Sequence, residues 1–137
     1  MSSSARRRPE QVLFVDRDAW SVALGAALDA AGISYVAHHD RFKPDTPDEQ
    51  WLAAAGREHW VVLTRDQNIR RRPAELAAFK AAKVVVFVLS QGNLSATETA
   101  TIVTGAYARM MRMAKGARRP ALFTLLRSGQ IQRLEFR

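Results

Sequence analysis

The chain contains no cysteine. This absence excludes disulfide bonds, zinc sites built from thiolates and a cysteine nucleophile. It also agrees with a reducing compartment, so we expect the protein to be cytoplasmic.

Long apolar runs are absent too, since none approaches the roughly 18 residues that a membrane-spanning helix needs. The first ten residues, MSSSARRRPE, are basic but include no apolar segment, so they do not resemble a secretory signal. We interpret residues 1–10 as a mobile basic tail. Residues 11–137 are expected to form a single domain, because the chain has 137 residues and 47% of them are hydrophobic.

Glycine is scarce, with seven residues, and the nucleotide-binding motifs that depend on glycine are missing. No GK[ST] loop is present, which argues against a Walker-type nucleotide site. No G-x-G-x-x-G follows the first apolar run, which argues against a Rossmann cofactor site.

Acidic residues are outnumbered, at 13 against 21 lysines and arginines, which gives a net charge of +8. Such an excess attracts polyanions. We therefore expect nucleic acid or an acidic protein as a partner.

Short apolar runs alternate with helix-periodic segments along the chain. This alternation predicts a three-layer α/β/α sandwich with a mostly parallel central sheet. The run VVVFVL is apolar throughout, as expected for a central strand covered on both faces. Strands are predicted at 11–15, 33–37, 59–64, 84–89, 122–126 and 131–136, and helices at 18–31, 46–56, 74–82 and 95–114, with a loop at 38–45.

Two of the predicted helices begin with a capping box. Thr46 and Glu49 form one, with Pro47 at the first helical position, and Ser95 and Glu98 form the other. These signals fix the expected starts of both helices.

Three aspartates fall where the predicted strands and helices meet. Asp16 ends the first strand, Asp66 follows the third, and Asp48 lies in the first turn of the helix leading to that third strand. Sites in open parallel sheets form at the carboxyl ends of the strands. Carboxylates gathered there would hold a hard cation such as Mg²⁺ or Mn²⁺, which can activate water against a phosphodiester.

Each acid also has a structural interpretation. Asp16 could cap the following helix. Asp48 and Glu49 are explained equally by the capping box and by the helix dipole. Asp66 could simply stabilise a turn.

Three segments together resemble a known family. Phe14-Val15-Asp16, the run DEQWLAAAG from Asp48 to Gly56, and the run VVLTRD from Val61 to Asp66 are similar to the motifs of PIN-like domains. The nearest similarity is to the compact toxins of the VapC type. The resemblance extends from about residue 11 to residue 89.

The resemblance implies a Mg²⁺- or Mn²⁺-dependent endoribonuclease, often the toxin of a toxin–antitoxin pair. It assigns the catalytic, metal-binding acids to Asp16, Asp48 and Asp66, and a supporting hydroxyl to Thr64. Larger members carry a further acid on a helix that this chain lacks, and Asp40 is the candidate replacement. Glu49 is an alternative to it. An acidic antitoxin and a homodimer are the expected partners.

Basic side chains near the acids are candidates for gripping RNA phosphates. They are Arg65, Arg70, Arg71 and Arg72, although a solvated basic turn explains them nearly as well. A second basic group, between Arg109 and Arg119, is explained by the preference of cations for helix C-termini.

His38 and His39 could be metal ligands or a general base, and a polar loop explains them equally well. Trp20, Trp51 and Trp60 are expected in the core rather than stacked on bases. One alternative function stays open, in which the fold is a non-catalytic module that binds RNA or an acidic protein through its basic surface.

Overall fold

The computed structural model describes residues 11–90 and 93–136, so the predicted basic tail at 1–10 lies outside the described residues. The described part contains six strands and five helices. In order they are β1 (Leu13–Val15), α1 (Val22–Ala30), β2 (Tyr35–Ala37), α2 (His38–Arg41), α3 (Asp48–Glu58), β3 (Val61–Thr64), α4 (Pro73–Ala82), β4 (Val85–Leu89), α5 (Ala96–Gly116), β5 (Ala121–Leu125) and β6 (Ile131–Leu134).

The strands form one sheet in the order β2-β1-β3-β4-β5-β6. The first five run parallel, and β6 pairs antiparallel with β5 through a turn at Gly129. Every residue of β4 is buried, as predicted for a central strand. The mostly parallel α/β sandwich is therefore confirmed.

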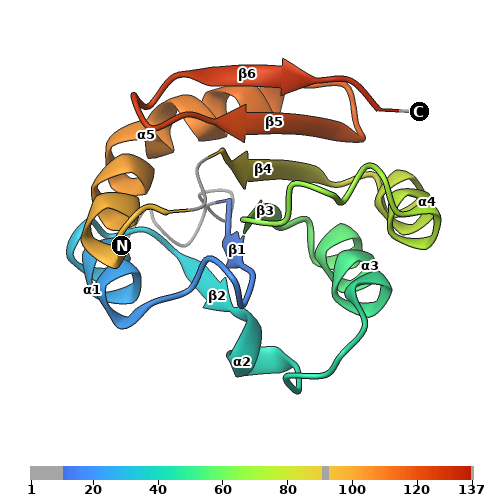
Figure 1. Ribbon diagram of the computed structural model, residues 1–137, viewed down its shortest axis with the longest axis horizontal. Coiled ribbons are helices and arrows are strands. Elements are labelled where there is room, and N and C mark those ends of the chain that lie inside the picture. Colours follow the sequence, from blue (N-terminus) through green and yellow to red (C-terminus); the bar gives the residue numbers. More distant parts are fainter. Residues whose placement is uncertain (1–10, 91–92, 137) are drawn as a thin grey trace, which may run out of the picture.

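Helices cover both faces of this sheet (Figure 1). Side chains of α1 and α5, such as Leu28 and Met110, pack on one face with Leu63 and Phe87. Side chains of α3 and α4, such as Trp51 and Phe79, pack on the other. Successive strand residues alternate between the two cores, as the pleat of a β-strand requires.

The structure corrects three local predictions. The first helix begins at Val22, not Asp18, because the Ser21 hydroxyl accepts the backbone N–H of Leu24 and caps it. The predicted loop at 38–45 contains the one-turn helix α2. The capping box at Thr46 does not form: the N-cap of α3 is Pro47, which stays extended with a ψ of 145° and offers no side-chain cap.

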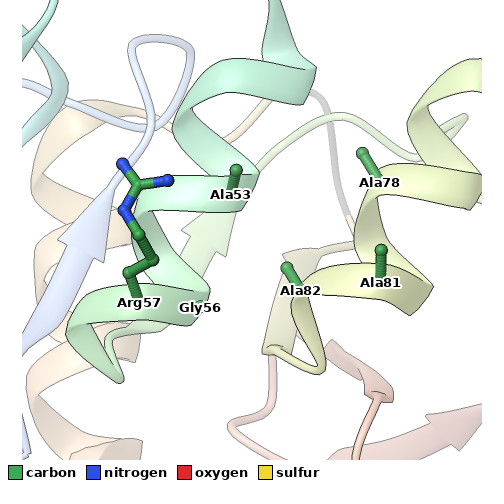
Figure 2. Close-up of a pocket in the computed structure, with 6 residues that line it drawn as sticks. All are labelled: Ala53, Gly56, Arg57, Ala78, Ala81 and Ala82. Carbon is green, nitrogen blue, oxygen red and sulfur yellow. The ribbon is translucent and has the colours of Figure 1, made fainter.

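Helices α3 and α4 pack face to face through small residues. Figure 2 shows Ala53 and Gly56 of α3 across from Ala78, Ala81 and Ala82 of α4, and these residues line a cavity of about 380 Å³ together with Arg57. The approach is closest at Gly56, where a Cβ atom would lie 2.5 Å from the Ala82 carbonyl oxygen. This packing sets how the N-terminal ends of the two helices lie relative to each other.

We predict that Gly56→Ala lowers the free energy of unfolding by about 1–3 kcal/mol, because the added methyl group forces the backbones of α3 and α4 apart. Gly105→Ala in the exposed middle of α5 is the matched control. A Cβ atom there meets nothing within 4 Å, so this change should stabilise the protein by about 0.5–1 kcal/mol. Urea unfolding of both variants measures the effects, and equal shifts would contradict the close approach at Gly56.

Candidate active site

A polar cleft of about 260 Å³ lies at the carboxyl ends of β1 and β3. It combines the three predicted acids with basic and polar side chains from the loops around them. Its lining residues are Asp16, Arg17, Asp18, His38, Pro44, Thr46, Asp48, Asp66 and Arg72.

Asp16 forms the floor of this cleft, directly after β1. Its side chain is buried, with one carboxylate oxygen accepting the Thr64 hydroxyl at 2.8 Å and the other accepting the Arg17 N–H at 2.7 Å. Burial, and next the charge of Asp18, raise the pKa of Asp16 from 3.8 to about 7. The interpretation of Asp16 as a helix cap is wrong, because Ser21 caps α1.

Thr64, the last residue of β3, connects the acids of the two neighbouring strands. Its hydroxyl donates to Asp16 and accepts the backbone N–H of Asp66 at 3.1 Å. Asp18 lies beside it, accepting the Arg65 N–H at 2.9 Å. A single hydroxyl thus fixes the spacing of the acids that follow β1 and β3.

Asp48 lies in the first turn of α3, and the N-terminal end of this helix lies close enough to the strand ends for Asp48 to line the same cleft as the other acids. Its carboxylate accepts the indole N–H of Trp51 at 2.9 Å. Trp51 is only 1% exposed and belongs to the core between the sheet and helices α3 and α4. The core therefore fixes the orientation of this acid.

Asp66 forms a second group with Asp48 and Glu75, the latter in the first turn of α4. One carboxylate oxygen from each of the three lies within 4.8 Å of the others, an arrangement that can hold a metal ion. The Arg72 guanidinium lies 2.6 Å from Asp66 and 2.8 Å from Glu75. Asp66 also accepts the Asn68 N–H, so it stabilises a turn and lines the cleft at once.

The two candidates for an additional acid lie elsewhere. Asp40 does not line the cleft; its carboxylate accepts the Ala37 N–H at 3.0 Å and closes the first turn of α2. Glu49 is exposed on α3 and belongs to neither group of acids. The structure instead brings Asp18 to the cleft and Glu75 to the group with Asp48 and Asp66.

The predicted RNA-binding arginines have different surroundings. Arg65 reaches the Thr99 hydroxyl at 2.7 Å, and Arg70 donates to the Glu135 carbonyl at 2.7 Å. Arg72 contacts the acids, and Arg71 is exposed. Arg17, which the sequence interpretation did not single out, is exposed and lines the cleft.

The two histidines separate, as expected for neighbours in sequence. His38 lines the cleft but is only 2% exposed, packed against Phe14 and Phe42, and its burial lowers the pKa. His39 lies at the surface over Trp20. The prediction of core tryptophans is confirmed for Trp51 and Trp60; Trp20 is half-buried.

The chain is thus an α/β protein in which carboxylates gather at the carboxyl ends of adjacent parallel strands, an arrangement that can hold a hard divalent cation. Residues 12–91 match the family model described as a PIN like domain, which is more than half of the chain. The chain therefore belongs to the PIN-like domain family. Its members are generally nucleases that use divalent metal ions.

The other comparisons add no further relative: no curated protein and no solved structure gave a significant match. Among the described residues, none of the helices is long and apolar enough to span a membrane.

Proposed function

We propose that this protein is a Mg²⁺- or Mn²⁺-dependent endoribonuclease of the VapC-type toxin kind. The observation that carries the proposal is the convergence of Asp16, Asp48 and Asp66 on one polar cleft. These acids come from three separate elements, and the fold orients each of them with a specific donor.

The residues present fit a hard divalent cation. The donor set consists of carboxylate oxygens, the ligands that Mg²⁺ and Mn²⁺ prefer. Burial, and next the charge of Asp18, already disfavour the ionised form of Asp16, and a nearby cation would stabilise that form. Asp16, Asp48 and Asp66 would hold the ion, with Asp18 and Glu75 beside them. When bound, the ion would activate water and neutralise charge on the phosphodiester.

Other side chains of the protein orient the acids and offer positive charge to the substrate. Thr64 orients Asp16, and the Trp51 indole orients Asp48. Arg17 lines the cleft and is exposed, so it offers a cation for the substrate phosphates near the acids. The net charge of +8 supports both an RNA substrate and an acidic antitoxin. We also propose that the protein forms a homodimer, as toxins of the VapC type commonly do.

Incubation of the purified protein with a mixed RNA pool and a circular single-stranded RNA tests the proposal. We expect linear fragments from the circle with Mn²⁺ and none with EDTA, since an endonuclease needs no free end. Degradation of linear RNA alone would indicate an exonuclease. No cleavage of either substrate, combined with RNA binding, would favour the non-catalytic module.

A further inference from the structure

Arg72 bridges two acids at the edge of the candidate metal site. One of its guanidinium nitrogens lies 2.6 Å from a carboxylate oxygen of Asp66 and 2.8 Å from one of Glu75. Both distances are those of charge-assisted hydrogen bonds. The Asp66 and Glu75 side chains are only 18% and 16% exposed, so water compensates little of their charge.

These contacts leave Asp66 with a donor on each carboxylate oxygen. One oxygen accepts the Asn68 N–H at 3.0 Å, and the other accepts Arg72. Asp66 and Glu75 also belong to the group of oxygens that lie within 4.8 Å of one another together with Asp48. A divalent ion entering that group would meet the guanidinium on two of the same carboxylates and would be repelled by its charge.

The side chain of Arg72 is able to leave. It is 47% exposed, and its residue is the N-cap of α4, where no side-chain cap bond restrains it. Without the arginine, Asp66 still accepts the Asn68 N–H, and the backbone of Glu75 is held in the first turn of α4. Movement of the arginine therefore requires no rearrangement of the backbone that carries the acids.

We propose that Arg72 is an internal cation that competes with the divalent metal for Asp66 and Glu75 and thereby sets the metal affinity of the cleft. The inference rests on the proposed function, because it concerns the same acids. In the metal-free protein Arg72 neutralises the two carboxylates, and the metal binds only by displacing it.

Calorimetric titration of the protein with MnCl₂ tests this competition without any measurement of activity. We compare the wild type with Arg72→Gln and with Arg71→Gln, an exposed neighbour whose loss changes the net charge equally. Arg72→Gln is expected to bind Mn²⁺ about tenfold more tightly, equivalent to about 1.4 kcal/mol. Arg71→Gln should stay within about twofold of the wild type, as expected for an exposed charge.

Thermal melts provide a second measurement on the same proteins. Without metal, Arg72→Gln should melt below the wild type because its carboxylates repel each other without compensation. With Mn²⁺ it should show the larger increase in Tm. If Arg72→Gln does not fold, Arg72→Lys replaces it. Lysine keeps the charge, but its ammonium is more strongly hydrated than a guanidinium, so it should leave the carboxylates more readily and tighten Mn²⁺ binding in the same direction.

The outcomes separate this inference from the proposed function. Equal Mn²⁺ affinity in the wild type and Arg72→Gln would overturn the competition and leave the metal site intact. An equal gain in Arg71→Gln would assign the effect to general charge and overturn it as well. No Mn²⁺ binding by any of the three proteins would overturn both.

Discussion

Replacing Asp66 with Asn is expected to lower Mn²⁺-dependent RNA cleavage at least about a hundredfold, the upper range seen when only a group supporting a metal ligand is lost. The amide keeps an oxygen that can accept the Asn68 N–H, so the turn should survive. It removes the negative charge that Asp66 contributes beside Asp48 and Glu75. Initial cleavage rates of wild type and variant, purified identically, measure the loss.

Asp40→Asn provides the matched control for this loss. It removes one carboxylate charge as well, but Asp40 is an exposed residue that accepts the Ala37 N–H and does not line the cleft. We expect its cleavage rate to stay near that of the wild type. An inactive Asp40→Asn with an active Asp66→Asn would place the reaction at a different group of acids, and equal activity in all three proteins would point to a contaminating nuclease.

The positions of Asp16 and Asp66 could be predicted because they depend on where two strands end. Apolar runs that stop at an acid predict strand ends, and strand ends in a parallel sheet lie at one edge. Thr64 and Asp66 follow from that rule, and so does Asp16. The central place of β4 follows equally from its unbroken apolar run.

Asp18 was missed because its segment was interpreted as the start of a helix. In the structure α1 begins only at Val22, after the N-cap Ser21, and the Asp16 carbonyl accepts the N–H groups of Ala19 and Trp20 in a turn. That turn brings the Asp18 carboxylate to the end of β3, where it accepts the backbone N–H of Arg65. The available signal was Ser21 itself, a favourable N-cap residue three positions further on.

Glu75 could not be found from local sequence at all. It follows three arginines and a proline, a pattern that indicates a basic turn and a helix start. Its approach to Asp48 depends on how α4 packs against α3, and that packing depends on the contact of Gly56 with Ala82. Such contacts between distant segments leave no mark in the periodicity of either helix.

The Asp16→Asn variant should be more stable than the wild type in EDTA at pH 8, by about 2–4 kcal/mol. The folded protein raises the pKa of this carboxyl from 3.8 to about 7, mainly by burial. Below pH 3.8 the proton is bound in both the folded and unfolded states. As the pH rises toward 7, only the unfolded state releases it readily, so the wild type loses about 1.4 kcal/mol per pH unit. Asn cannot ionise and avoids this loss.

The sign of the effect can be checked in two ways. The stability difference between Asp16→Asn and the wild type should grow between about pH 4 and pH 7 and then level off, in urea unfolding with EDTA. Asp29→Asn, at an exposed position on α1, should show no such growth.

Mn²⁺ at pH 8 should stabilise the wild type more than Asp16→Asn, because the variant has lost one of the carboxylates proposed to hold the ion. A pH-independent difference would mean that the folded protein accommodates the Asp16 charge without a metal. A difference that grows between about pH 4 and pH 7 would instead show that burying the ionised Asp16 carboxylate lowers the free energy of unfolding. Stabilisation by Mn²⁺ would show that a bound cation restores it.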